Sequence, residues 1–174
     1  MRKAYPELAA IPFSSARKRM SFVTNHPEDA GLVRVFVKGA SEIVLERCVE
    51  VVKANGETEI ISNEQKEDIE LNVIDSYAKK AYRTLTLSYK DMSREEFERN
   101  LPYESEESQK TLENQLCLVA IVGIQDPLRK EIRQAVQDCY NSHVNVRMVT
   151  GDNIITARAI ALEAGILDEK SKNK

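Results

Sequence analysis

The chain has 174 residues and a formal net charge of −3. This charge argues against nucleic acid as the main partner, because a phosphate backbone binds a basic surface. The longest apolar run, Leu116–Ile124, falls well short of the roughly 20 residues that cross a bilayer, and the first residues lack the apolar core of a secretory signal. We therefore expect a soluble chain in a cytosolic environment, long enough for one domain or for one domain and part of another.

The cysteines and histidines do not suggest a metal site. Cys48, Cys117 and Cys139 each lie in an apolar periodic segment, so we expect all three to be core thiols. His26 and His143 are far apart, and neither stands at ligand spacing from a cysteine or from the other histidine. A structural metal site is therefore not expected.

The first half of the chain combines short strands with two helices. Alternating apolar residues predict strands at Leu8–Phe13, Arg19–Thr24, Val33–Val37, Val49–Lys53 and Thr84–Tyr89. Helices are expected at Ser41–Cys48 and after the capping-box pair Ser62 and Gln65, on a segment that continues to Ala81. These elements predict an α+β unit, an antiparallel sheet covered by helices.

Residues 91–115 are rich in acidic side chains, and we interpret them as a solvated insertion. Ser105 and Ser108 stand among glutamates and are candidate phosphate acceptors, although a plain soluble loop is the favoured interpretation. The basic run Arg17–Arg19 is similarly interpreted as a solvated strand edge.

From Leu116 onward the pattern changes to strand, helix, strand, helix. The strands are Leu116–Ile124 and Val144–Met148, and the two helices carry apolar faces around Val136 and Ala159. Such a βαβα segment belongs to a Rossmann-like parallel sheet with helices on its faces. Two strands are too few for that domain, so we expect the sheet to be completed by other sequence or by a partner.

The carboxyl end of each predicted parallel strand is followed by a polar turn. After the second strand, Thr150, Gly151 and Asp152 offer a hydroxyl, a close backbone approach and a carboxylate, which suit a phosphate and a metal ion. The alternative is an ordinary turn capped by Asp152 or Asn153. After the first strand, Asp126 is equally compatible with a helix N-cap and with a functional role.

Three weaker signals in the first half would suit a nucleotide. Phe13 could stack on a purine, and Lys38 with Gly39 places a cation at a turn. Arg83 could donate two hydrogen bonds to a phosphate. Neither a Walker lysine loop nor a Gly-x-Gly-x-x-Gly pattern occurs, so any nucleotide is held by other means.

Four motifs, taken in order, resemble the P-type cation-transporting ATPases. They are Pro12–Ser21 (PFSSARKRMS), Val37–Glu42 (VKGASE), Gly123–Arg129 (GIQDPLR) and Met148–Asn153 (MVTGDN). Within that family the chain looks most like the plasma-membrane-type calcium-transporting pumps, whose versions of the second and fourth motifs it resembles closely. The reticulum-type pumps usually have proline where Ser41 stands.

The resemblance implies a role for each matching residue. It places ATP against a nucleotide-binding group consisting of Phe13, Lys18, Met20, Lys38, Gly39 and Arg83. Thr150, Gly151 and Asp152 match the catalytic loop that holds the transferred phosphoryl group. Asp126, Pro127 and Arg129 match the hinge motif between two domains.

The resemblance also implies a domain organisation. Residues 1–115, with the acidic insertion 91–115, would be part of the nucleotide-binding domain, and residues 116–174 the start of a phosphorylation domain of the haloacid dehalogenase type. The phosphorylated aspartate, the later magnesium loop, the dephosphorylation motif and the membrane helices are absent from this sequence. The chain is therefore not expected to turn over alone, and most of any Mg²⁺ site would lie outside it.

The prediction is the ATP-binding part of a pump that couples ATP hydrolysis, through an aspartyl phosphate, to Ca²⁺ export. The full-length protein would lie in the plasma membrane or a vacuolar-type membrane, with this segment on the cytosolic face. Its partners would be ATP and the rest of the pump; the resemblance allows calmodulin, but no motif here indicates it. The alternatives are a non-catalytic nucleotide-binding regulatory module, a pump for another cation, and a dehalogenase-type phosphatase.

Overall fold

The computed structural model describes residues 5–168 and divides into two compact units. The first unit contains the described residues up to Glu70 together with Leu85–Val122, and the second contains Leu71–Thr84 together with the described residues from Gly123 onward. Among residues 5–168, no helix combines the length and the apolar character that a membrane span requires.

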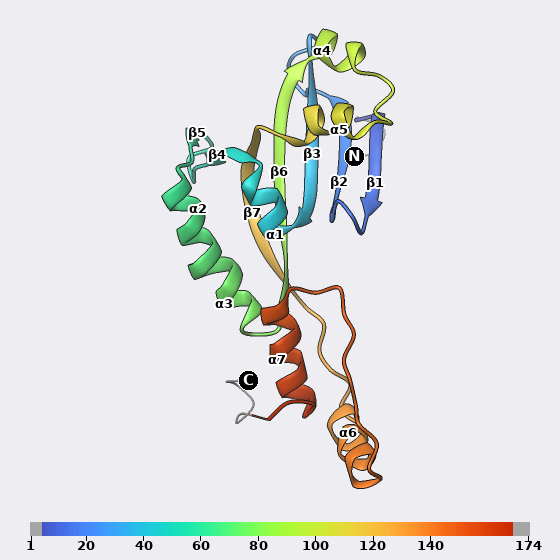
Figure 1. Ribbon diagram of the computed structural model, residues 1–174. Helices are drawn as coiled ribbons and strands as arrows, with labels where there is room; N and C mark the ends of the chain where they lie inside the picture. The colour runs from blue at the N-terminus through green and yellow to red at the C-terminus, as the bar shows by residue number, and fades with distance from the viewer. Residues whose placement is uncertain (1–4, 169–174) are drawn as a thin grey trace. The chain divides into compact units, whose positions relative to one another are not determined.

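A seven-stranded sheet is the framework of the first unit, and it runs in the order β1-β2-β3-β6-β7-β4-β5 (Figure 1). The strands are β1 (Glu7–Ser14), β2 (Arg19–Asn25), β3 (Leu32–Ala40), β4 (Cys48–Val52), β5 (Thr58–Ile60), β6 (Tyr82–Ser93) and β7 (Leu116–Gln125). The predicted α+β class is confirmed. The sheet is mixed rather than antiparallel, because β7 pairs parallel with β4.

The helices account for most of the remaining described chain. They are α1 (Ser41–Glu46), α2 (Asn63–Ile69), the π-helical segment η1 (Glu70–Ile74), α3 (Asp75–Ala78), α4 (Arg94–Arg99), α5 (Glu106–Glu113), α6 (Ile132–Asn141) and α7 (Ile154–Ala164). The predicted capping box is confirmed: the Ser62 hydroxyl accepts from the Gln65 N–H, and the Gln65 side chain accepts from the Ser62 N–H. Helix α2 therefore begins where the sequence predicted.

Alternation along β2 and β3 separates a buried sheet face from an open one. Val33, Val35 and Val37 of β3 are buried, as are Ser21 and Val23 of β2. The residues between them point to the opposite face, because successive side chains of a strand alternate. This second face carries Met20 and Lys38, whereas Gly39 belongs to the buried face.

The acidic segment is not a solvated loop, contrary to the sequence-based interpretation. It forms the end of β6 and helices α4 and α5, and Phe97, Tyr103 and Leu112 are buried. The Tyr103 hydroxyl donates to the Phe97 carbonyl at 2.8 Å, and the two rings stack with centroids 5.5 Å apart. Burial raises the pKa of Tyr103 to about 12, as expected for a phenol removed from water. These aromatic side chains anchor the charged segment to the unit.

The second unit lacks the second strand predicted from the sequence. Residues 143–150 form no regular element, so the prediction of a strand at Val144–Met148 is wrong. Helices α6 and α7 do form, and they are joined by a hydrogen bond from the Tyr140 hydroxyl to the carbonyl of Ile166 at 3.1 Å. A strand needs neighbouring strands for its backbone groups, and the described chain supplies none to this segment.

The structure also excludes one of the two interpretations of Asp126 and corrects the prediction for one cysteine. Asp126 is not the N-cap of the helix after β7: α6 begins at Ile132, its N-cap is Glu131, and Pro127 precedes the helix instead of lying in its first turn. Cys48 and Cys117 are buried as expected, whereas Cys139 is only half-buried.

Candidate functional site

The turn between β1 and β2 presents two of the predicted nucleotide-binding residues. Phe13 lies near the end of β1 and is 61% exposed, so its ring is open to contact from solvent. Lys18 has a φ of 53°, and its N–H donates to the Ser14 carbonyl at 2.7 Å, which closes the turn. The Lys18 side chain is exposed. The turn therefore presents an aromatic ring and a cation to solvent.

The end of β3 packs directly against this turn. The Ala40 N–H donates to the Lys18 carbonyl at 2.9 Å, and Arg19 pairs with Gly39 in the β2–β3 register. A Cβ at Gly39 would lie 2.5 Å from both the Arg19 Cβ and the Lys18 oxygen, so no side chain fits there. Glycine thus allows the close approach that brings Lys38 beside the turn.

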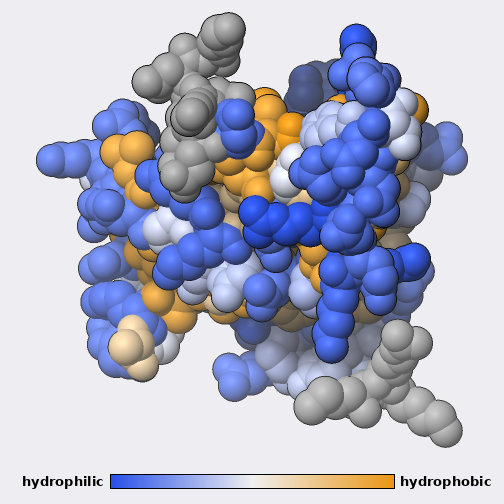
Figure 2. Space-filling view, turned by 90° about the horizontal axis from the view of Figure 1, so that it is seen from below, coloured by the Kyte–Doolittle hydropathy of each residue, from blue (hydrophilic) through white to orange (hydrophobic). Residues whose placement is uncertain are grey.

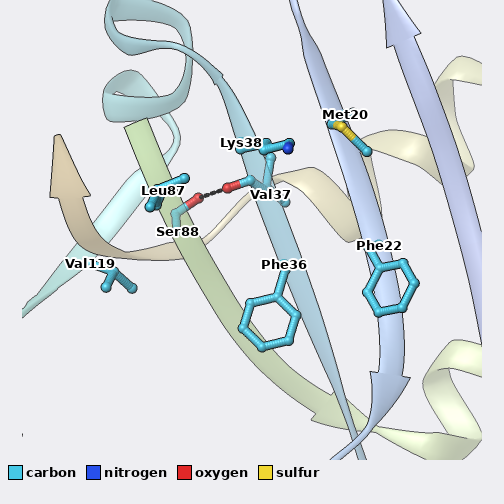
Figure 3. A pocket seen from close by; sticks show the side chains of 8 residues that line it. All are labelled: Met20, Phe22, Phe36, Val37, Lys38, Leu87, Ser88 and Val119. Carbon is cyan, nitrogen blue, oxygen red and sulfur yellow. Dashed lines mark hydrogen bonds between the residues drawn. The ribbon is translucent and has the colours of Figure 1, made fainter. Parts of the chain in front are cut away.

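A cavity of about 460 Å³ opens on the face of the sheet that carries Lys38 (Figure 3). It is lined by Met20, Phe22, Phe36, Val37, Lys38, Leu87, Ser88 and Val119. The Ser88 hydroxyl donates to the Val37 carbonyl at 3.1 Å, which ties β6 to β3 beneath the cavity. Mostly apolar walls with a cation at one end suit a flat, partly apolar ligand that carries negative charge. Phe13 is not among the lining residues.

A buried carboxylate supports the β1–β2 turn from the sheet's other face. The Glu113 side chain is fully buried and accepts from Nε of Arg19 at 2.7 Å and from the Ser21 hydroxyl at 2.6 Å. It also accepts from Nη1 of Arg17, whose Nη2 donates to the Pro12 carbonyl. The interpretation of the basic run as a solvated edge is therefore wrong for Arg17 and Arg19.

Sequence reasoning missed Glu113 because it lies among exposed acids in a charged segment. The only local signal is its place directly after Leu112 and shortly before the apolar strand β7. A buried acid needs a partner of opposite charge, but the sequence reveals neither that Glu113 is buried nor which basic residue pairs with it.

The second unit contains the loop Thr150–Asp152 and Arg83. Nε of Arg83 lies 3.0 Å from Oδ1 of Asp152, and the second contact, from Nη2 to Oδ2, is 3.2 Å. The Thr150 hydroxyl donates to the same Oδ2 at 2.8 Å and accepts from the Asp152 N–H at 3.1 Å. The structure thus brings Arg83 together with the predicted phosphoryl loop. Gly151 is exposed, and no described atom lies within 4 Å of the position of a Cβ there.

Helix α7 begins directly after this loop. The Asn153 side chain caps it by accepting from the Ile155 N–H at 2.7 Å, so Asn153, rather than Asp152, is the N-cap. A cavity of about 620 Å³ adjoins the loop and is lined in part by Thr150, Asp152 and Arg158. Free N–H groups at a helix start and a hydroxyl beside them can bind an anion.

Apolar side chains also reach solvent around this loop. Val149 is 96% exposed and Ile154 is 79% exposed, although both flank the polar residues Thr150 and Asp152. In the view of Figure 2, hydrophobic patches lie between the hydrophilic ones on the surface. The apolar side chains on both sides of the loop are therefore open to contact with other protein segments.

The predicted hinge residues lie outside the regular elements of the structure. Asp126, Pro127 and Arg129 are all exposed, on the irregular segment between β7 and α6.

Mg²⁺ prefers several oxygen ligands. Among residues 5–168 no group of three His, Cys, Asp or Glu side chains is placed to hold a metal ion, and Asp152 is already engaged by Arg83.

Comparison with known proteins identifies the family of the chain. The family model for the P-type ATPase cytoplasmic domain N matches residues 1–131, so the chain belongs to the P-type ATPase family.

Individual relatives show which group of P-type ATPases the chain resembles. The chain is 46% identical over 166 residues to the putative calcium-transporting ATPase 11, plasma membrane-type, of Arabidopsis thaliana, covering 95% of the chain and 15% of that protein. It is 39% identical over 170 residues to the human plasma membrane calcium-transporting ATPase 1, covering 96% of the chain and 13% of that protein. The chain thus resembles plasma membrane-type calcium-transporting ATPases and spans only a small part of their length.

Proposed function

We propose that this chain is the ATP-binding cytosolic part of a P-type pump that couples ATP hydrolysis, through an aspartyl phosphate, to Ca²⁺ export across a membrane. Family membership supports nucleotide binding, and similarity to calcium-transporting ATPases supports calcium as the ion. The aspartate that becomes phosphorylated, the ion path and most of the Mg²⁺ site would belong to other parts of the pump.

The proposed nucleotide site is the open face around the β1–β2 turn. Adenine would stack on Phe13, Met20 would contribute to the apolar wall, and Lys18 and Lys38 would attract the negative charge of ATP. The observation that carries this assignment is the hydrogen bond of 2.9 Å from the Ala40 N–H to the Lys18 carbonyl, beside the close packing at Gly39. This contact joins the first two motifs, which lie on the neighbouring strands β2 and β3.

The proposed phosphoryl site is the loop Thr150–Asp152, with Arg83 beside it. The Thr150 hydroxyl and the backbone at Gly151 would hold the transferred group, and Arg83 would contact the ATP phosphates by its forked donors. The work of these residues would be positioning and charge stabilisation, which is most of what phosphoryl transfer requires.

We further propose that the boundary between the nucleotide-binding and phosphorylation domains lies near residue 115, and that Asp126, Pro127 and Arg129 form part of the hinge. Because β7 belongs to the sheet of the first unit, the residues after β7 would join a dehalogenase-type parallel sheet that other segments of the pump complete. The exposed Val149 and Ile154 are consistent with such a completing surface.

Titration of the chain with ATP, followed by amide chemical shifts, tests the site assignment. Phe13→Ala should weaken ATP binding through lost stacking, and Arg83→Ala through a lost phosphate contact. Ile60→Ala is the control, because Ile60 is 82% exposed on β5 and has no proposed contact with ATP. Unchanged affinity in both site variants would contradict the assignment.

A further inference from the structure

We infer that Glu113 is a positioning residue of the nucleotide site: its buried carboxylate holds the β1–β2 turn in the shape that presents Phe13 and Lys18. The inference rests on the proposed nucleotide site and adds a residue that contacts no nucleotide itself. Glu113 lies in α5, on the buried side of the sheet, whereas the cavity lies on the open side.

The carboxylate is connected to the turn by two arginine side chains. Arg17 donates to Glu113 through Nη1 and to the Pro12 carbonyl through Nη2, so it links the carboxylate to the backbone directly before Phe13. Arg19 donates to Glu113 through Nε and to the Arg17 carbonyl through Nη1, at 2.9 Å, and so holds the turn on either side of Lys18. Both ends of the turn are therefore attached to one carboxylate.

The helix that carries Glu113 is itself fixed. Leu112 is fully buried, and the Lys90 ammonium of β6 donates to the Thr111 carbonyl. Burial lowers the pKa of Lys90, as expected for an ammonium group that is largely removed from water. The carboxylate is thus held at a fixed place against the sheet.

The charge of Glu113 is needed at this place. Three donors, from Arg17, Arg19 and Ser21, converge on its two oxygens. An amide at the same position would direct its own N–H groups at a guanidinium donor and leave buried donors without an acceptor. The turn would then lose its support while the hydrophobic core stayed unchanged.

The test compares Glu113→Gln with Glu107→Gln, which makes the same chemical change at an exposed position of α5. Two quantities are measured in the 174-residue chain: ATP affinity, and hydrogen exchange of individual amides without ATP. We expect Glu113→Gln to weaken ATP binding roughly tenfold, which is about 1.4 kcal/mol. It should also speed exchange at Lys18 and Ala40, while exchange at Val35 in the centre of β3 stays unchanged. Glu107→Gln should change neither quantity.

Three outcomes would overturn the inference: unchanged ATP affinity in Glu113→Gln, unchanged exchange at Lys18 and Ala40, or equally faster exchange at Val35, which would indicate a general structural role. If Glu113→Gln does not fold, Arg17→Lys tests the inference instead. It keeps the charge and removes the pair of guanidinium donors that links Glu113 to the Pro12 carbonyl. It should weaken ATP binding several-fold, and unchanged affinity would refute the inference. If the unsubstituted chain does not bind ATP, the proposed function fails, while the exchange measurement still tests the support of the turn.

Discussion

Arg83 contacts both carboxylate oxygens of Asp152, at 3.0 Å from Nε to Oδ1 and 3.2 Å from Nη2 to Oδ2, although 69 residues separate the two in sequence. This forked contact connects the start of β6 with the loop before α7 within the second unit. It also places a cation of the predicted nucleotide-binding group on a carboxylate of the predicted phosphoryl loop, an arrangement that neither prediction indicates by itself.

Arg83→Lys should change the free energy of unfolding by less than about 1 kcal/mol, because ion pairs exposed to this degree contribute little. The Arg83 side chain is 54% exposed, and a lysine cannot reproduce the fork. Urea unfolding of both chains measures the difference. Arg99→Lys is the matched control, because Arg99 pairs with Glu95 at an even more exposed place. A loss of several kcal/mol at Arg83 alone would mean that this pair holds the second unit together.

Gly39→Ala should destabilise the first unit by about 1–3 kcal/mol, the usual cost of forcing atoms into a packed place. The added methyl would meet the Arg19 Cβ and the Lys18 carbonyl oxygen at 2.5 Å, and neither is the end of a flexible side chain. Thermal or urea unfolding measures this effect. Gly151→Ala is the control, because the space around that position is open. Equal stability of the two variants would refute the close approach of β3 to the turn.

Ser62→Ala should cost about 1 kcal/mol of stability, because it removes the side-chain acceptor at the start of α2. Gln65→Ala should cost a smaller amount, and the double variant should cost less than the sum, since the two side chains act as one reciprocal cap. A double-mutant cycle from urea unfolding measures the coupling. Strict additivity would contradict the capping box.

Cys48 should be the slowest of the three cysteines to react with iodoacetamide in the folded chain. Burial raises the pKa of its thiol to about 12, so little reactive thiolate forms near neutral pH. Cys139 is half-buried and should react first. Mass spectrometry after timed labelling separates the three sites, and labelling in urea provides the fully exposed reference. Rapid modification of Cys48 under native conditions would contradict its burial.

The folded chain should lose stability at high pH because of the Cys48 thiol. The folded pKa of Cys48 lies above its ordinary value of 9.0, so the protonated thiol is favoured in the folded state. Its contribution is fully present below about pH 9 and is lost as the pH rises towards 12. Urea unfolding at a series of pH values, compared with Cys48→Ala, measures this. The variant should lose the part of the pH dependence that belongs to Cys48, and identical profiles would contradict the assignment.

Local patterns were the part of the fold that the sequence predicted well. Strands β1 to β3 follow from alternation, and the start of α2 follows from Ser62 and Gln65, because those contacts join residues close in sequence. The motifs containing Lys18 and Gly39 were also found, and the structure brings these two residues together. Their roles in binding remain a proposal.

Long-range pairing was the part that the sequence did not predict. The burial of Tyr103 and Glu113 was not predicted, because most side chains of the charged segment around them do face solvent. The parallel pairing of β7 with β4 was not predicted either, because a strand pattern does not specify its partner. The expected strand at Val144–Met148 has the right alternation but no neighbouring strand.

The late position of Glu113 also has a consequence for synthesis on the ribosome. Arg19 emerges 94 residues before the carboxylate that neutralises it, so the nascent β1–β2 hairpin carries an uncompensated arginine pair during that interval. Closure of such a distant contact is slow compared with hairpin formation. The nascent chain therefore completes the shape of this turn only after α5 has left the exit tunnel.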